Sequence, residues 1–309
     1  MNSAAKRHRR PGLDASGLLL IDKPSGWTSH DVVARMRRIV GQRRIGHTGT
    51  LDPAATGLLV LCLGRATRLV EYMTEHRKRY KGSIRLGIST NTDDAEGDVI
   101  STTGTPDLNE DAVRDLELGF TGDIQQRPPV FSAVKVKGQR AYAAARRGSP
   151  LELAERPVHV DSLKLQRDGD HLRFELLCGP GTYVRSIARD IGASIGCGAH
   201  LAELRRTEIG KARVENAFTL EQVAELTQAG LLPKAVRPAD EGLLDWNAAL
   251  LSAEKADQIR NGNMVRVATK HAAERVRIYG ADGLFLATAR VGPNGQIRPL
   301  KVLEPSNRT

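Results

Sequence analysis

The segment RRIGHTGTLDPAATG, residues 43–57, holds a single acid, Asp52, among glycine, threonine, proline and alanine, with His47 five residues earlier. Asp-Pro commonly begins a turn, so the spacing alone favours a solvated turn. The alternative is a reactive loop in which Asp52 is a lone nucleophile or base. Three familiar templates fit poorly. The lysine of a phosphate-binding loop is missing, no second acid lies close by as most glycosidases require, and His47 with Asp52 is too small a ligand set for a metal.

Apolar strands and one capped helix are expected on either side of this segment. Residues 17–22 (GLLLID) and 57–64 (GLLVLCLG) are apolar runs typical of buried strands. Between the first run and the segment, apolar residues recur at helical spacing. Thr28 or Ser29 is placed to cap the start of this helix, and Gly41 to end it.

The rest of the chain mixes strands and helices without a regular alternation. Helices are predicted at 66–73, 109–120, 182–196 and 219–228, strands at 78–88, within 127–148 and on both sides of the turn at 167–170, and a polar loop at 89–98. Beyond a change of composition near 233–248, the turn signals GADG (280–283) and GPNG (292–295) predict a small β-rich domain at about 250–305. The irregular order indicates an α+β fold rather than a doubly wound one.

Charge and cysteine content restrict the class of protein. The 309 residues carry 46 Lys and Arg against 36 Asp and Glu, a net charge of +10, which favours a polyanion such as nucleic acid as partner or simply a basic soluble protein. The three scattered cysteines form no zinc framework and suit a reducing compartment, and no apolar run approaches membrane-spanning length. We therefore expect a cytoplasmic protein with no membrane partner, and residues 1–12 as a disordered basic tail.

Six segments, read together, resemble the TruB family of tRNA pseudouridine synthases. In chain order they are GLLLIDKPSGWTSHDVV, RRIGHTGTLDPAATGLLVLCLGRATRL, KRYKGSIRLGISTNTDDAEGDV, RPPVFSAVKVKGQRAYAAARRG, CGPGTYVRSIARDIG and AHLAELRRTEIG. The resemblance covers about residues 16–212 and continues more weakly to the C-terminus. It implies the pseudouridine synthase fold, with a central mixed, largely antiparallel sheet flanked by helices. The implied division is a catalytic domain at 13–245 and a small PUA-like RNA-binding domain with a tail at 246–309.

The resemblance also implies a reaction. A uridine in RNA becomes pseudouridine when the N1–C1′ bond breaks, the base turns and C5 bonds to C1′. No atoms or electrons leave the substrate, so the implied enzyme needs no cofactor and no metal. The family's substrate is uridine 55 in the T loop of tRNA, so the T arm of tRNA is the expected partner. We expect a monomer with no obligatory protein partner.

The family's functional residues carry over one by one. Asp52 matches the essential catalytic carboxylate, which attacks C1′, attacks the base or removes a proton from C2′. Tyr80 matches the aromatic residue that stacks on the target base, and Tyr183 and Arg185 match the pair near the acid. His47 matches the histidine that fills space near the flipped-out base. Leu204 matches an apolar wall of the pocket, and Lys23 a residue that supports the catalytic loop. Without the resemblance, each of these side chains has an ordinary structural explanation.

A basic insertion at about 127–150 resembles the family's RNA-clasping segment. Its cations suit phosphates, although a solvated helix face explains them equally well; they are Lys135, Lys137, Arg140, Arg146 and Arg147. The acidic stretch TDDAEGD (92–98) matches a calcium loop only faintly.

Three other functions remain open at this point. One is a non-catalytic tRNA-binding or tRNA-folding factor, which would share the charge and the clasping segment. Another is an N-ribosyl hydrolase, which would release free uracil and usually needs a second acid or a metal. The last is a guide-RNA-directed relative of the pseudouridine synthases, from which the compact chain already differs.

Overall fold

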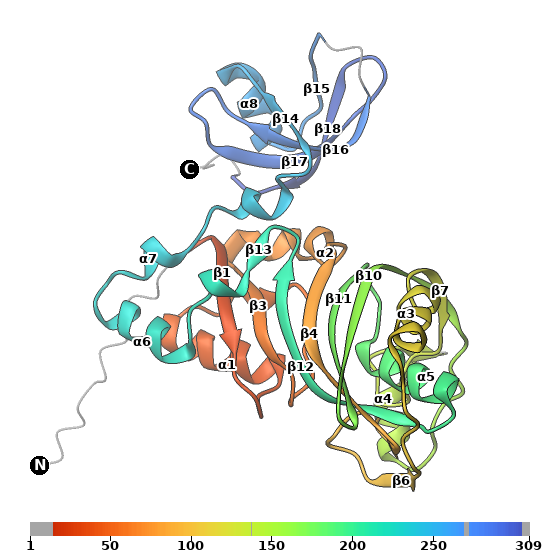
Figure 1. Cartoon of the computed structure of the whole chain (residues 1–309). Helices are drawn as coiled ribbons and strands as arrows, with labels where there is room; N and C mark the ends of the chain where they lie inside the picture. The colour runs from red at the N-terminus through yellow and green to blue at the C-terminus, as the bar shows by residue number, and fades with distance from the viewer. Residues whose placement is uncertain (1–14, 137, 269–271, 305–309) are drawn as a thin grey trace, which may run out of the picture.

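The computed structural model describes residues 15–136, 138–268 and 272–304, and a nine-stranded sheet dominates this part of the chain (Figure 1). Its strands are β1 (Gly17–Lys23), β2 (Ile45–His47), β3 (Thr56–Leu63), β4 (Lys78–Leu86), β7 (Gly122–Gln126), β10 (Arg156–Asp168), β11 (His171–Cys178), β12 (Ala199–Ile209) and β13 (Ala212–Arg213). The order is β1-β3-β12-β4-β11-β10-β7, with β2 beside β3 and β13 beside β12. Within this sheet every described pair is antiparallel except β12 with β3. The predicted α+β class with a mixed, largely antiparallel sheet is confirmed.

Helices cover the two ends of this sheet (Figure 1). The ordinary α-helices are α1 (Ser29–Val40), α2 (Val70–Met73), α3 (Glu110–Gly119), α4 (Ala141–Arg146), α5 (Val184–Ile195), α6 (Leu220–Gln228) and α7 (Leu232–Ala235), and short 3₁₀ turns are η1 (Gly64–Leu69), η2 (Val214–Asn216) and η3 (Ala239–Leu243). Helices α1 and α6 lie at the β1 end, and α3 and α5 at the β10 end. The predicted caps of α1 are confirmed: Thr28 forms a capping box with Asp31, and Gly41 ends the helix in the left-handed conformation.

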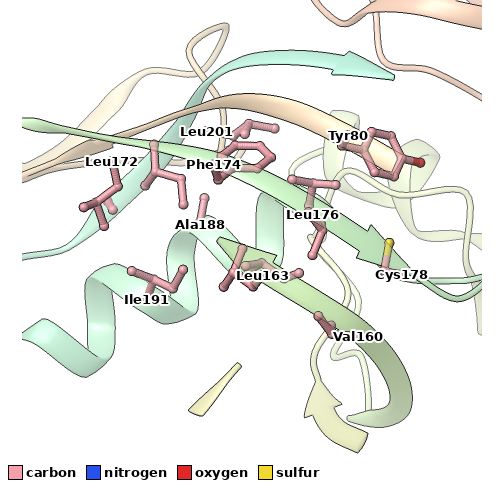
Figure 2. Packing of buried hydrophobic residues seen from close by; sticks show 14 of the residues in the cluster. Tyr80, Val160, Leu163, Leu172, Phe174, Leu176, Cys178, Ala188, Ile191 and Leu201 are labelled. Atoms are coloured by element: carbon pink, nitrogen blue, oxygen red, sulfur yellow. The ribbon is translucent and has the colours of Figure 1, made fainter. Parts of the chain in front are cut away.

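Three apolar cores hold these helices to the sheet, of which one packs η1, α2 and η3 against β1 and β3. A second packs α1, α6 and α7 against β1 and β3, and includes Met36, Leu61 and Val223. The third packs α5 against β12, β4, β11 and β10. Figure 2 shows this third core, with Tyr80 at one end and its hydroxyl oxygen directed away from the other labelled side chains. Tyr80 is therefore packed in the core, while its hydroxyl group lies at the border of that core.

The C-terminal β-rich domain is a second sheet, ordered β14-β16-β17-β18-β15. Its elements are β14 (Asn247–Leu250), α8 (Ala253–Arg260), β15 (Val265–Arg266), β16 (Ala273–Tyr279), β17 (Phe285–Val291) and β18 (Gln296–Val302). The predicted turns at 280–283 and 292–295 join β16 to β17 and β17 to β18. Helix α8 was not expected. The Tyr72 and Trp246 rings, 4.9 Å apart, and the Lys301–Glu71 ion pair connect this domain to α2.

Three elements differ from the sequence-based prediction. The helix expected at 66–73 is the 3₁₀ turn η1 followed by the single turn α2, and Leu63 gives η1 no side-chain cap. The loop expected at 89–98 begins as strand β5 (Ile88–Thr90), which pairs with β6 (Val99–Thr102), because Asn91 and Asp98 bond to each other and close a hairpin. Strand β12, in the middle of the sheet, was not predicted as a strand.

Some expectations lie beyond the structural evidence. The tail at 1–12 lies outside the described residues. The domain limits at 13–245 and 246–309 stay predictions. None of the described helices combines the length and apolar character needed to cross a membrane.

Candidate active site

Asp52 lies in the loop that joins β2 to β3. The Asp52 carbonyl accepts a hydrogen bond from the Ala55 amide at 3.1 Å, so the backbone does form the turn that Asp-Pro predicts. The carboxylate does not cap this turn; within the described chain it bonds to Arg185, 133 residues away. The turn and the functional interpretation of Asp52 are therefore compatible: the turn presents the carboxylate.

Residues far away in sequence hold this loop in place. Ser29, at the start of α1, exchanges two hydrogen bonds with the Leu51 backbone, accepting from its amide at 2.9 Å and donating to its carbonyl at 3.2 Å. The fully buried Lys23 Nζ donates to the carbonyls of Pro24, Trp27 and Pro53 at 2.6–3.0 Å. Burial lowers the pKa of Lys23 to about 8, although nearby Asp52 acts in the opposite direction.

Arg206 holds the other side of the same loop. This β12 side chain is 1% exposed, and its guanidinium donates to the carbonyls of Gly49, Thr50 and Leu58 at 3.0, 3.3 and 2.8 Å. Gly57 allows this close approach, because a Cβ at that position would lie 2.3 Å from the Arg206 carbonyl oxygen and φ is +98°. Three backbone carbonyls thus depend on one buried guanidinium.

Replacing Arg206 by methionine is expected to lower the free energy of unfolding by about 3 kcal/mol or more, because three carbonyls lose their donor. Urea denaturation measures this change. The control is Arg205→Met, one residue earlier, where a partly exposed ion pair with Asp22 is lost and a change below about 1 kcal/mol is expected. Equal changes in the two variants would contradict the role given to Arg206.

Arg185 connects Asp52 to a second acid, Asp94. Its Nη2 donates to Asp52 Oδ1 at 3.2 Å, and its Nε lies 3.0 Å from Asp52 Oδ2 in an orientation that misses hydrogen-bond geometry. Nη1 lies 3.4 Å from Asp94 Oδ2 and donates to the Thr92 carbonyl, while Nη2 also donates to the Phe131 carbonyl. The Arg185 side chain is 7% exposed, so α5, the β5–β6 hairpin and the insertion meet at one buried cation.

The Asp52 carboxylate faces a cavity of about 300 Å³. Five of the residues expected to be functional line this cavity: Asp52, Tyr80, Tyr183, Arg185 and Leu204. They come from the loop and from β4, α5 and β12, and its other walls include Lys78, Phe131, Ser132, Ala133 and Arg206. The arrangement sets one carboxylate beside a buried aromatic ring and an apolar wall, with room for a small planar group.

The environment of Asp52 shifts its protonation. Burial raises the pKa of Asp52 above its usual value; Arg185 and Lys23 oppose this, and Asp94 adds to it. The side chain is still 38% exposed, because it opens into the cavity. Burial likewise raises the pKa of Tyr80, whose neighbour Arg206 acts in the opposite direction.

Gln126 fixes the backbone beside the cavity at the start of α5. Its side-chain oxygen accepts from the Tyr183 amide at 2.8 Å and its nitrogen donates to the Tyr183 carbonyl at 3.1 Å. The Arg156 guanidinium lies 5.0 Å from the centre of the Tyr183 ring. Tyr183 and Arg185 are thereby held in a fixed relation to each other.

Two expected site residues lie outside this lining. Lys23 supports the loop from behind, as described. His47, at the end of β2, accepts from the Gly49 amide through Nδ1 at 3.3 Å and contacts His30, with the ring centres 5.6 Å apart. Burial lowers the pKa of His47, to which His30 and Arg206 add. His47 faces a neighbouring cavity that Arg43 and Arg44 also line.

The basic insertion lines one side of the cavity with uncharged residues and carries cations on the surface of the molecule. Lys135 in β8 (Lys135–Val136) and the residues Arg146 and Arg147 are exposed, and Arg146 lies 4.5 Å from the centre of the Tyr142 ring. Lys137 lies outside the described residues, and the Arg140 side chain, in β9 (Gln139–Arg140), is likewise not described. Residues 131–133 close one side of the cavity.

The acidic stretch at 92–98 pairs with arginines. Asp94 contacts Arg185, and Asp93 lies 3.0 Å from Arg189. Across the described chain, no group of three His, Cys, Asp or Glu residues is arranged to hold a metal ion.

Three residues of the site were missed by the sequence analysis: Arg206 and Lys78, which line the cavity, and Asp94, which contacts Arg185 outside that lining. Asp94 carried no signal beyond its acidic stretch, and Arg206 stood in a motif, AELRRTEIG, whose leucine alone was assigned. Lys78, whose Nζ donates to the Thr74 and His76 carbonyls, has its pKa lowered to about 8 by burial. Both cations have an acid within three residues in sequence, so they look like ordinary surface charges, and their burial is not readable from the letters.

Three family models match the chain along most of its length. They describe the N-terminal domain of TruB family pseudouridylate synthases (residues 37–184), the C-terminal domain of tRNA pseudouridylate synthase B (185–244) and the C-terminal region of pseudouridine synthase II TruB (248–303).

Curated relatives carry the same description. The relative in Ruegeria pomeroyi, called tRNA pseudouridine synthase B, is 48% identical to this chain over 257 residues. The match covers 82% of this chain and 84% of the relative. The relative in Nitrosococcus oceani is 38% identical over 301 residues, covering 96% and 98%.

Solved structures share the fold. A Cbf5–Nop10–Gar1 complex contains a chain with a TM-score of 0.72 and 24% identity, covering 94% of this chain and 85% of that one. An H/ACA RNP bound to a substrate RNA containing 2′-deoxyuridine contains another, with a TM-score of 0.73 and 22% identity, covering 97% and 93%. At these identities the likeness concerns the fold alone.

Proposed function

Because the chain belongs to the TruB family of pseudouridine synthases, we propose that it converts uridine 55 in the T loop of tRNA to pseudouridine, with Asp52 as the essential carboxylate. It is an isomerase that acts on tRNA. The observation that carries the assignment of Asp52 is its position at the cavity, held by Arg185 and accompanied by Tyr80 and Leu204.

The reaction needs one ionised carboxylate. The N1–C1′ bond breaks and a C5–C1′ bond forms, while the proton on C5 is lost and N1 gains one, so the atoms balance. Asp52 begins this sequence as a nucleophile at C1′ or at the base, or as a base toward the proton on C2′. In all three routes Arg185 favours the ionised form and fixes the direction of the carboxylate oxygens.

The other cavity residues receive the target nucleotide. A uridine must leave its stack, at a cost of a few kcal/mol, before it enters a cavity of this kind. The buried Tyr80 ring offsets part of that cost, since base–aromatic stacking contributes about 1–3 kcal/mol. Leu204 and Tyr183 flank the base, Lys23 keeps the loop in place through Pro53, and His47 lines the separate cavity with Arg43 and Arg44.

The test is incubation of the purified chain with an unmodified tRNA transcript, followed by mapping of pseudouridine at each position. Pseudouridine at position 55, formed without guide RNA or partner protein, supports the proposal. Binding without any product would indicate a tRNA-folding factor, free uracil would indicate a hydrolase, and activity only with an added guide RNA would indicate a guide-directed enzyme.

The rate at saturating tRNA is expected to fall as pH decreases through the raised pKa of Asp52, because the protonated carboxyl is neither nucleophile nor base. A raised folded-state pKa means that the folded chain binds more protons than the unfolded chain between the two pKa values. This group therefore makes the fold more stable, not less, as the solution becomes acidic. Single-turnover rates, with circular dichroism at each pH, measure the effect. A constant rate down to the ordinary pKa of 3.8 would contradict it.

A further inference from the structure

Five arginines lie on the solvent side of α1 and on the approach to β2. This surface, called here the α1–β2 patch, consists of Arg35, Arg37, Arg38, Arg43 and Arg44, and all five side chains are exposed. Residues 27–47 contain one acid, Asp31, which is occupied in the capping box of α1. The patch is therefore a concentrated positive surface.

The α1–β2 patch differs from the other arginine-rich parts of the molecule. Elsewhere arginines commonly pair with carboxylates, as Arg79 does with Glu208 and Arg205 with Asp22. Within the described residues no patch arginine makes an ion pair, and among their guanidinium groups only that of Arg37 makes a hydrogen bond, to the Ile45 carbonyl at 3.0 Å. The patch thus carries four guanidinium groups with free donors.

Local structure explains only part of this charge. Arg37 and Arg38 lie in the last turn of α1, where the helix dipole favours cations. Arg43 and Arg44 lie beyond the helix, and Arg35 repels Arg38 three residues later on the same face. An accumulation of like charge that costs the fold stability points to an anionic partner.

The position of the patch indicates which anion it receives. Arg37, Arg43 and Arg44 line a cavity of about 470 Å³ together with His30 and His47. His47 is five residues from Asp52, so even a fully extended chain places the two within roughly 18 Å. The cavity lined by the patch is therefore close enough to the Asp52 cavity for a few consecutive nucleotides of one strand to span both.

We propose that the α1–β2 patch binds phosphates of the substrate RNA next to the target nucleotide, as a second contact surface distinct from the insertion at 127–150. This inference rests on the proposed function for its choice of RNA. Arginines at this density bind a phosphate backbone without reading its sequence, so they add affinity and salt dependence.

Two double variants test the patch, Arg43→Gln/Arg44→Gln and Arg35→Gln/Arg38→Gln. Arg37 is left in place because it supports the Ile45 carbonyl. The matched control is Arg114→Gln/Lys164→Gln, which removes two exposed cations from α3 and β10 at the opposite end of the sheet. Binding of the full chain to an unmodified tRNA transcript is measured by filter binding over a range of salt concentrations.

Each patch variant is expected to weaken binding about tenfold near 0.1 M salt and to reduce the slope of log K against log salt by about 1 per lost contact. The control should match the wild type in both quantities. Patch variants indistinguishable from the control would overturn the inference. Pseudouridine is measured in the same samples: a wild type that makes no product while the patch variants lose binding overturns the proposed function and leaves this inference standing.

Discussion

Replacing Asp52 by asparagine is expected to abolish pseudouridine formation, lowering the rate by about 10⁴-fold or more, while tRNA affinity changes by less than about threefold. Asparagine keeps the size of the side chain and removes the charge, so it is no nucleophile or base. Arg185 still contacts Asp94 and the Thr92 and Phe131 carbonyls, which keeps the cavity in shape. The measurement is single-turnover pseudouridine formation, with binding determined separately.

Asp93→Asn is the matched control for this variant. Asp93 pairs with Arg189 and is not part of the cavity lining, and its left-handed backbone suits asparagine. We expect this control to retain its activity. Because a partly buried carboxylate with a raised pKa disfavours folding at neutral pH, Asp52→Asn should melt within a few degrees of the wild type. Full turnover by Asp52→Asn would remove the residue from the chemistry.

Replacing Arg185 by lysine is expected to lower kcat by about 100-fold or more with a much smaller change in KM. One ammonium cannot serve two carboxylates and two carbonyls that the guanidinium reaches from three nitrogens. The lysine ammonium keeps the charge but is shorter and loses the two-nitrogen contact with Asp52, so the main influence that lowers the pKa of Asp52 is weakened and the acidic limb of the pH–rate profile moves to higher pH. A purely structural role would not move that limb.

Arg189→Lys provides the comparison, one turn further along α5. Arg189 contacts Asp93 and Asp190 and bonds to the Arg127 carbonyl, outside the cavity lining. If both lysine variants lose kcat equally and share an unchanged pH profile, Arg185 acts only by holding α5 to its neighbours.

Local signals predicted the elements that local interactions specify. Helix α1 has its capping box and its left-handed Gly41 within its own sequence, so its ends were predictable. Strand β12 was not: Leu201 and Leu204 are three residues apart, as on a helix, and the pairing with β4 runs through two register shifts. Apart from the short pairing with β13 at its end, the strand partners of this segment, β3 and β4, lie more than 100 residues away in sequence.

The distinction between local and remote interactions also explains which site residues could be predicted. Spacing alone gave Asp52 the interpretation of a turn residue, and the family resemblance, not periodicity, singled out Tyr80, Tyr183, Arg185 and Leu204. Asp94 and Arg206 were missed because their partners are remote: Arg206 bonds to a carbonyl 157 residues earlier. A residue that contacts the loop only in the folded chain has no local sequence pattern by which it could be predicted.

Because β12 lies in the middle of the sheet, the sheet can be completed only late in synthesis. Strands β3 and β4 are synthesised early and lie near each other in the chain. In the sheet, however, they are separated by β12, which ends at Ile209. Until then both carry unpaired edges, and the loop around Asp52 lacks the Arg206 donor. A nascent chain shorter than this has neither a continuous sheet nor a complete cavity, and its exposed strand edges favour aggregation while translation continues.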